Sequence, residues 1–210
     1  TALQHPNIVR MIGSGSSDGI VYLAMEYLNG DDLSWKLKLQ GVLTLDETRD
    51  ILTSLCLALD YAHEKGFVHR DIKPSNVMLR QSRDGETLEA VLMDFGVAKV
   101  REAQTAITGT GGIGTIGYMA PEQIMAAKEV DNRADIYALG VMAYEMLTGE
   151  LPFKGSPAQV MFAHLQQPPP DPRDVNDDLS SPVAHAILRA LAKQPDDRFS
   201  SAGEFAAALG

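Results

Sequence analysis

Five types of polar side chain occur together in one short stretch of the sequence, Val68-His69-Arg70-Asp71-Ile72-Lys73-Pro74-Ser75-Asn76. Pro74 lacks a backbone donor and disfavours helical geometry at Lys73, so this stretch is predicted to be an irregular loop. Apolar segments lie on both sides, Ala58 to Ala62 before it and Val77 to Leu79 after it. A loop that holds a carboxylate, an ammonium group and a carboxamide between packed elements is a common place for chemistry.

Three short motifs follow one another along the chain. The loop has the spacing His-Arg-Asp-x-x-x-x-Asn, and Asp94-Phe95-Gly96 and Ala120-Pro121-Glu122 come after it. Together these motifs resemble those of the protein kinase family. The resemblance covers the whole chain but only part of the family's domain. The family's Gly-rich loop, strand lysine and helix glutamate would all precede His5-Pro6-Asn7-Ile8-Val9.

The resemblance assigns the chemistry to a few polar residues. Asp71 matches the base that accepts the proton of an attacking hydroxyl, and Lys73 offers positive charge to the transferred phosphoryl group. Asn76 and Asp94 supply oxygen ligands of the kind that Mg²⁺ prefers, so they are expected to hold the metal ion against ATP. Thr115 matches a threonine that contacts the loop. Together with Lys73 it indicates the serine/threonine branch of the family.

The adenine of ATP is expected to lie against the linker Met25-Glu26-Tyr27-Leu28, whose backbone would offer hydrogen bonds. By the same resemblance Met25 corresponds to the gatekeeper and Asp32 to an acid that contacts the ribose. Met78 would form the floor beneath the adenine. Each of these residues also has a plain structural interpretation, as strand core or turn.

Other motif residues are expected to be structural. The resemblance predicts that His69 and Phe95 pack together in the core and that Asp135 holds the backbone of the loop. It also predicts a buried ion pair between Glu122 and Arg198. Removing one partner of such a pair strongly destabilises a protein, because it leaves a buried charge without compensation.

Arg70 is expected to be regulatory. Its guanidinium would pair with a phosphorylated residue of the segment from Lys99 to Thr115 and so order that segment. Thr105, Thr108 and Thr110 are the candidate phosphate acceptors, and the sequence does not distinguish between them.

The periodicity of apolar residues predicts the elements that position these groups. Ile8 to Ile12 and Ile20 to Met25 predict a β-hairpin around a turn rich in Gly, Ser and Asp. Thr44-Leu45-Asp46-Glu47 predicts the capped start of a helix that continues to Gly66. Short strands are predicted at residues 77–79 and 90–93, on either side of a polar turn.

The remainder of the chain after Pro121 is predicted to be helical. The stretch from Asp135 to Leu147 is apolar nearly all round, as expected for a helix at the centre of the core. Further helices fit residues 159–165, 182–192 and 201–209, the last opened by a capping box of Ser201 and Glu204. We therefore predict an α+β, protein-kinase-like fold: a remnant of the N-lobe at residues 1–28 and a mainly helical C-lobe at residues 29–210. The C-lobe would contain a catalytic loop (68–76), an activation segment (94–122) and a helical remainder (123–210).

Composition limits the function classes. The 210 residues are 45% hydrophobic and 22% charged, which fits one or at most two globular domains. A formal net charge of −10 argues against nucleic acid or an anionic membrane as the main partner. No apolar run approaches the ~18 residues of a membrane span. Cys56, the single cysteine, is expected to be a buried apolar residue. Thr1 and the residues after it read like the middle of a protein, so we expect a truncated chain.

Two hypotheses follow for the function. The first is a cytoplasmic serine/threonine kinase that transfers the γ-phosphoryl group of ATP to protein hydroxyls, nearly inactive here because its partner, the rest of the N-lobe in cis, is missing. The second is a kinase-shaped scaffold whose upstream lysine has degenerated, similar to a pseudokinase. The intact Asp71, Asn76 and Asp94 favour the first hypothesis. An unrelated binding fold is the remaining alternative.

Overall fold

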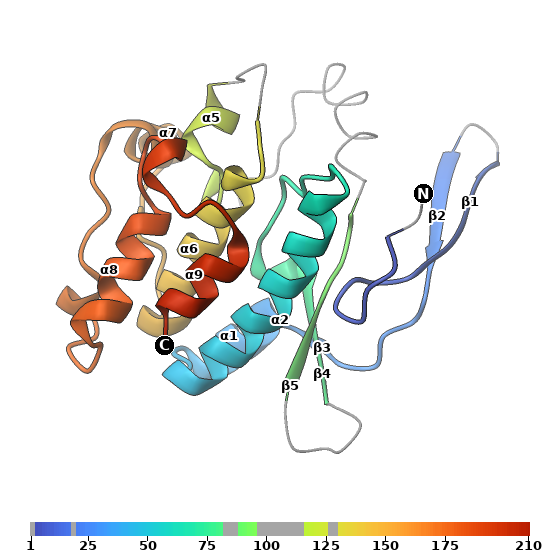
Figure 1. The fold of residues 1–210 in the computed structure, drawn as a ribbon, viewed down its shortest axis with the longest axis horizontal. Coiled ribbons are helices and arrows are strands. Elements are labelled where there is room, and N and C mark those ends of the chain that lie inside the picture. Colours follow the sequence, from blue (N-terminus) through green and yellow to red (C-terminus); the bar gives the residue numbers. More distant parts are fainter. Residues whose placement is uncertain (1–2, 18–19, 82–87, 96–115, 126–129) are drawn as a thin grey trace.

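The chain folds into a helical body with two small β-sheets, as predicted for the α+β class. This computed structural model describes residues 3–17, 20–81, 88–95, 116–125 and 130–210. Figure 1 shows the helices gathered on one side and a two-stranded hairpin standing on the other side.

The hairpin consists of the antiparallel strands β1 (Met11–Ser17) and β2 (Ile20–Met25). The predicted hairpin is therefore present, but β1 continues through glycine and serine residues that were expected to form the turn. Gly15 lies opposite Tyr22, and a Cβ atom at Gly15 would collide with the tyrosine ring, so a glycine fits this strand position. Ile8, expected at the start of β1, instead forms a parallel bridge with Leu92.

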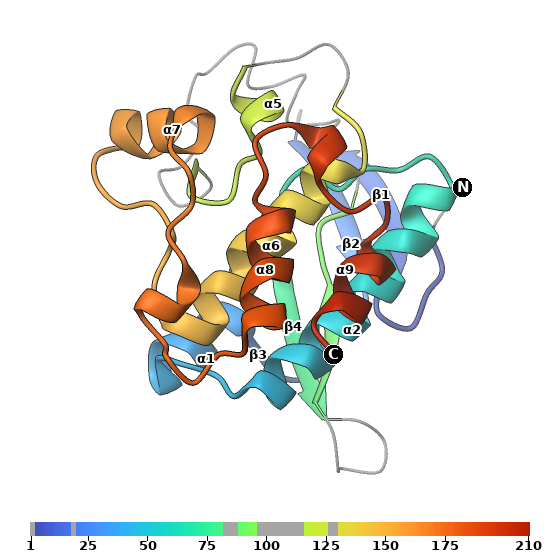
Figure 2. The ribbon, with the colours of Figure 1, turned by 60° about the vertical axis from the view of Figure 1, so that its left-hand side comes forward.

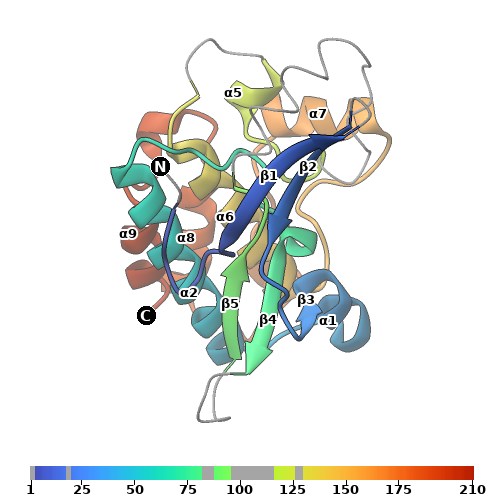
Figure 3. The same cartoon turned by 90° about the vertical axis from the view of Figure 1, so that its right-hand side faces the viewer.

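The second sheet has the strand order β3 (Asp31–Asp32), β4 (Val77–Gln81), β5 (Leu88–Leu92), and both pairings are antiparallel. Figure 3 shows β4 and β5 beside the hairpin, with helix α2 behind them. Both predicted strands are present. Because β4 and β5 are antiparallel, the residues just before β4 and just after β5 lie at the same end of the sheet.

Helix α2 (Leu45–Glu64) begins at the predicted capping box. The Glu47 amide donates to Thr44 Oγ1 at 3.2 Å, and the Thr44 amide donates to Glu47 Oε2 at 3.0 Å. The helix buries one apolar face, which includes Cys56 at 2% exposure. It ends just before Gly66, whose φ of +78° is a conformation that glycine adopts without steric penalty.

Helix α1 (Leu33–Gln40) was not predicted. Its sequence, Leu-Ser-Trp-Lys-Leu-Lys-Leu-Gln, alternates apolar and polar residues, which is the pattern of a strand rather than of a helix. The helix is set by its cap, because Asp32 Oδ1 accepts a hydrogen bond of 2.9 Å from the Trp35 amide.

Helix α6 (Arg133–Thr148) is the centre of the core, as predicted. Every residue of α6 except Arg133 and Glu145 is buried. The helix contacts α2, α8 (Ser181–Ala190) and α9 (Ala202–Ala208), and Figures 1 and 2 show it between them. The remaining helical segments are α5 (Pro121–Ile124), α7 (Pro157–Gln166), and the 3₁₀ turns η1 (Pro74–Asn76), η2 (Pro172–Asp174) and η3 (Pro195–Asp197).

The capping box predicted for α9 is only half present. Ser201 Oγ accepts from the Glu204 amide at 3.1 Å, but the Glu204 carboxylate accepts from Ser200 rather than from Ser201. The first amides of α9 are also bound by Asp60 of α2, at 2.8 Å to both Ala202 and Gly203. Within the described ranges, no helix combines the length and the apolar character needed to cross a membrane.

Candidate active site

The register of β4 and β5 brings Asn76 and Asp94 to the same end of the sheet. Val77 pairs with Leu92, and the Met93 amide donates to the Asn76 carbonyl at 2.9 Å. Asn76 directly precedes β4, and Asp94 follows β5 by two residues. The backbone pairing of β4 and β5 therefore brings the two predicted metal ligands to the same place, although they are distant in the sequence.

Asp71 is held by two neighbours from its own loop. Lys73 Nζ lies 2.9 Å from each carboxylate oxygen of Asp71. Asn76 Nδ2 donates to the Asp71 carbonyl at 2.7 Å and to Asp71 Oδ2 at 3.1 Å. Because the amide nitrogen of Asn76 faces Asp71, its carbonyl oxygen is the atom that could bind a metal ion.

His69 connects the loop to the segment that carries Asp94. Its Nε2 lies 2.8 Å from the Met93 carbonyl oxygen, and its Nδ1 lies 3.2 Å from the Asp71 amide nitrogen. A carbonyl can only accept and a backbone amide can only donate, so in these two contacts Nε2 is the donor and Nδ1 is the acceptor. The ring packs edge-on against Phe95 at 4.6 Å between centroids, which is the packing expected for this pair.

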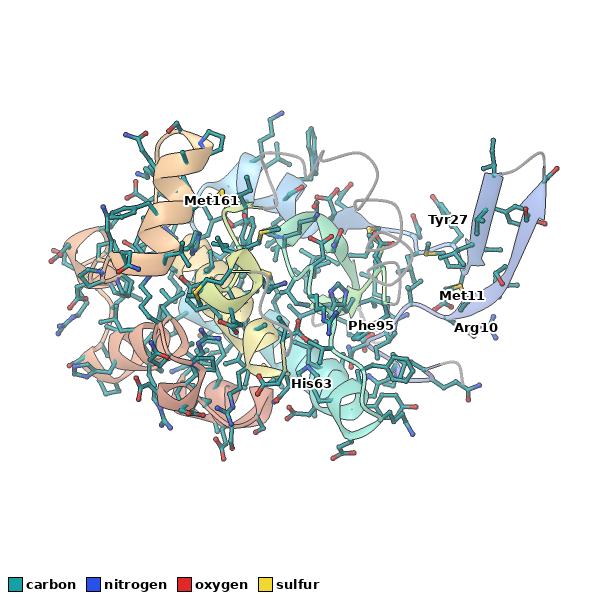
Figure 4. All side chains as sticks on the ribbon, turned by 90° about the horizontal axis from the view of Figure 1, so that it is seen from above. Arg10, Met11, Tyr27, His63, Phe95 and Met161 are labelled. Atoms are coloured by element: carbon teal, nitrogen blue, oxygen red, sulfur yellow. The ribbon has the colours of Figure 1, made fainter. Side chains whose placement is uncertain are left out.

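Asp135, 1% exposed in α6, holds the backbone of the loop as expected. Its Oδ2 accepts from the His69 amide and its Oδ1 from the Arg70 amide, both at 2.8 Å. His63 Nε2 also lies 2.8 Å from Asp135 Oδ2. Figure 4 shows His63 and Phe95 near the centre of the view, with the hairpin that carries Met11 standing apart at the right. His63 was not predicted as a site residue, because a histidine in the last turn of a helix gives no motif.

The predicted ion pair between Glu122 and Arg198 is present and bidentate. Arg198 Nη1 donates to Glu122 Oε1 at 2.7 Å and Nη2 donates to Oε2 at 2.9 Å. The side chain of Arg198 is 0% exposed and that of Glu122 is 9% exposed. The pair fixes α5 to the turn that follows η3.

Two of the residues predicted to contact the nucleotide lie side by side in the second sheet. Asp32 and Met78 are directly paired between β3 and β4. The Glu26 amide donates to the Arg10 carbonyl at 3.0 Å, so only the carbonyl of Glu26 remains a candidate to pair with adenine. Met25 ends β2, and Leu28 follows it in the irregular linker. Since Asp32 Oδ1 caps α1, its other carboxylate oxygen is the candidate for a ribose hydroxyl.

A groove of about 600 Å³ opens beside the loop. Lys73, Ser75, Tyr118 and Glu145 are among the residues that line it. Tyr118 Oη donates to Glu145 Oε2 at 2.6 Å. Burial raises the pKa of the Glu145 carboxyl, although the hydrogen bond from Tyr118 lowers it in part. Lys73, which is bonded to Asp71, is therefore reached from this groove.

The oxygen donors Asn76 and Asp94 fit Mg²⁺. In the part of the chain that the structure describes, no group of three or more His, Cys, Asp or Glu side chains could hold a metal ion. Mg²⁺ is commonly bound by one or two carboxylates with phosphate oxygens and waters completing its shell, so a small protein donor set suits it. Asp94 has a φ of +62°, a left-handed conformation that is uncommon for aspartate and often found at functional sites.

Thr115 and the candidate phosphate acceptors Thr105, Thr108 and Thr110 lie outside the described residues.

Comparison with known proteins agrees with the motifs. Residues 1–208 match the family model described as "Protein kinase domain". The chain is 44% identical to the serine/threonine-protein kinase Pkn1 of Myxococcus xanthus over 209 residues, which cover 98% of this chain and 29% of Pkn1. It is 39% identical to the serine/threonine-protein kinase PknJ of Mycobacterium tuberculosis over 208 residues, 97% of this chain and 35% of PknJ.

A solved structure is also similar. The PknI kinase domain of Mycobacterium tuberculosis, crystallised as a double mutant, superposes with a TM-score of 0.76 at 33% identity, covering 99% of this chain and 72% of that one. The chain spans about a third of the length of the curated relatives that it matches. The matched residues, the fold and the motifs agree, and the chain belongs to the protein kinase family.

Proposed function

We propose that this chain is the catalytic part of a serine/threonine protein kinase, which transfers the γ-phosphoryl group of ATP to serine or threonine hydroxyls of other proteins. The observation that carries the proposal is the Asp71 carboxylate, held by Lys73 and Asn76 beside the sheet end where Asp94 lies. The names of the relatives, serine/threonine-protein kinases from bacteria, support the same class.

In this proposal each residue has one task in the transfer. The substrate hydroxyl loses its proton to Asp71 while its oxygen forms a bond to the γ-phosphorus, and the bond from that phosphorus to the bridging oxygen breaks to release ADP. Lys73 stabilises the charge on the γ-phosphoryl oxygens. The carbonyl oxygen of Asn76 and the carboxylate of Asp94 would hold Mg²⁺, which neutralises phosphate charge when it is bound.

ATP is placed by the nucleotide-contacting residues in the same proposal. Adenine would lie between the linker 25–28 and Met78, and the ribose would lie at Asp32. Residues 1–28 would form part of the N-lobe. Because ATP is the phosphoryl donor, the catalytic part would act in the cytoplasm.

The test is phosphate transfer by the full-length protein from labelled ATP with Mg²⁺ to a mixture of protein substrates. Asp94→Asn keeps the shape of the side chain but removes its charge, and it is expected to reduce transfer roughly 100-fold or more. Asp50→Asn, a matched change at an exposed position of α2, is expected to leave transfer unchanged. Label should appear on serine and threonine. A wild-type protein that binds ATP without transferring phosphate would instead support the scaffold hypothesis.

A further inference from the structure

Gln123 uses both ends of its side-chain amide. Its Oε1 accepts from the Ala120 amide at 3.0 Å, and its Nε2 donates to the Arg70 carbonyl at 2.9 Å. The orientation of the amide is determined by its partners, because a backbone N–H can only donate and a backbone carbonyl can only accept. Gln123 therefore joins the start of α5 to the loop 68–76.

The residue that Gln123 contacts has an unusual backbone conformation. Arg70 has a φ of +67°, and residues other than glycine keep such a conformation only where the surrounding structure holds them in it. The Arg70 amide donates to Asp135 Oδ1 at 2.8 Å, and its carbonyl accepts from Gln123. Arg70 is thus held at its amide from α6 and at its carbonyl from α5.

The same contact determines how Asp71 is presented. The Arg70 carbonyl and the Asp71 amide belong to one peptide group, and the Asp71 amide donates to His69 Nδ1 at 3.2 Å. Gln123 and His69 therefore bind opposite edges of the peptide plane from which the Asp71 side chain projects. A rotation of this plane would move the carboxylate relative to Lys73 and Asn76.

Gln123 is itself mounted on a buried anchor. It directly follows Glu122, whose carboxylate forms the bidentate pair with Arg198. Ala120, which binds Gln123 Oε1, is fully buried. A side chain mounted on such an anchor can hold its partner in one geometry.

We propose that Gln123 is a positioning residue for phosphoryl transfer: by binding the Arg70 carbonyl, it fixes the peptide group that aims Asp71 at the acceptor hydroxyl. This inference rests on the function proposed above. The kinase motifs end at Glu122 and assign no role to Gln123.

The chain contains a matched control. Gln159 is the third residue of α7, as Gln123 is of α5, and both helices begin with proline. Gln159 Oε1 accepts from the Ser156 amide at 2.8 Å, which parallels the bond from Ala120. This bond lies within the first turn of α7, whereas Gln123 also donates to the Arg70 carbonyl of the loop. Gln123→Glu and Gln159→Glu both keep the capping oxygen, but only Gln123→Glu removes a donor from the Arg70 carbonyl.

The first measurement is steady-state kinetics of the full-length protein. Gln123→Glu is expected to lower kcat roughly 10- to 100-fold, as expected for a small displacement of a catalytic group, and to leave KM for ATP within about twofold. Gln159→Glu is expected to leave both constants within about twofold of the wild type. Equal kcat values in the two variants would overturn the proposal. A lower kcat in Gln123→Glu that is accompanied by a lower unfolding temperature would also overturn it, because the loss would then come from reduced stability.

The second measurement does not depend on activity. Amide hydrogen exchange at residues 69–72 is expected to become faster in Gln123→Glu and to remain unchanged in Gln159→Glu. Unchanged exchange in Gln123→Glu would overturn the inference. If the wild type transfers no phosphate, the proposed function fails, while the exchange result still decides whether Gln123 holds this peptide group.

Discussion

The ion pair between Glu122 and Arg198 allows a quantitative prediction of stability. A guanidinium has five N–H donors, and all five of Arg198 are used. Nη1 and Nη2 each bind one Glu122 oxygen, and they also bind the carbonyls of Arg133 at 3.0 Å and Lys193 at 3.1 Å. Nε binds the Ala192 carbonyl at 2.8 Å. The side chain of Arg198 is 0% exposed, so water cannot replace a lost partner.

Glu122→Ala would leave two of these donors without an acceptor and the buried positive charge without a carboxylate. Breaking a buried pair from one side destabilises a protein by about 3–5 kcal/mol. For a chain of this size, each kcal/mol shifts the unfolding midpoint by roughly 2–4 °C, so the midpoint should fall by roughly 6–20 °C.

Lys73→Ala is the comparison variant, measured by thermal unfolding under the same conditions. In this variant the Asp71 carboxylate loses its ammonium partner, but the side chains of Lys73 and Asp71 are 15% and 18% exposed, respectively. A pair that remains in contact with water contributes about 0–1 kcal/mol, which corresponds to at most about 4 °C. Glu122→Ala combined with Arg198→Met should be more stable than Glu122→Ala alone, because the unpaired charge is gone. Equal midpoints for Glu122→Ala and Lys73→Ala would refute this reasoning.

Three further predictions concern stability and reactivity. Asp60→Ala removes two hydrogen bonds to the start of α9 and should lower the free energy of unfolding in urea by about 2 kcal/mol, whereas Asp50→Ala at an exposed position should change it little. Burial, with a smaller contribution from Lys193, lowers the pKa of His164 to about 4, so the folded protein favours the neutral ring. As the pH decreases from about 6.5 towards 4, the free energy of unfolding of the wild type should therefore fall relative to that of His164→Gln, by up to roughly 3 kcal/mol. Urea unfolding of both proteins at pH 7 and pH 5 measures this difference. An equal change in the two proteins between these pH values would contradict the prediction. Burial also raises the pKa of the Cys56 thiol, so a thiol reagent should react with Cys56 only at the rate of unfolding, and reaction within the mixing time would count against its burial.

The sequence predicted those elements whose residues alone determine their structure. Helix α2 carries its own capping box and apolar face, and α6 is apolar nearly all round, so both were found. Helix α1 was missed because its alternating residues indicate a strand, and only the Asp32 cap and the packing of Leu33 and Leu37 make it a helix. The extension of β1 was missed because glycine is typical of turns. The reason for a glycine in this strand, the Tyr22 ring opposite Gly15, is visible only in the structure.

The sequence predicted those residues of the candidate site whose side chains the proposed chemistry requires. Carboxylate, carboxamide and ammonium groups at motif spacing identified Asp71, Asn76 and Lys73. His63 and Gln123 were missed because their partners are distant in the sequence. His63 contacts the Asp135 carboxylate, and Gln123 donates to the Arg70 carbonyl. Residues that support a site from other elements leave no local pattern, so they become visible only in three dimensions.

Arg70 shows why such support is needed. Glycine is the residue expected where φ is positive, yet this position carries an arginine, directly before Asp71. The loop cannot hold this conformation by its own propensity. It is held by Asp135 from α6 and Gln123 from α5, and α5 is in turn fixed by the buried partner of Glu122. The conformation of the loop is therefore a property of the packed helices, and a substitution that loosens α5 should disturb Asp71 even where no residue of the loop has changed.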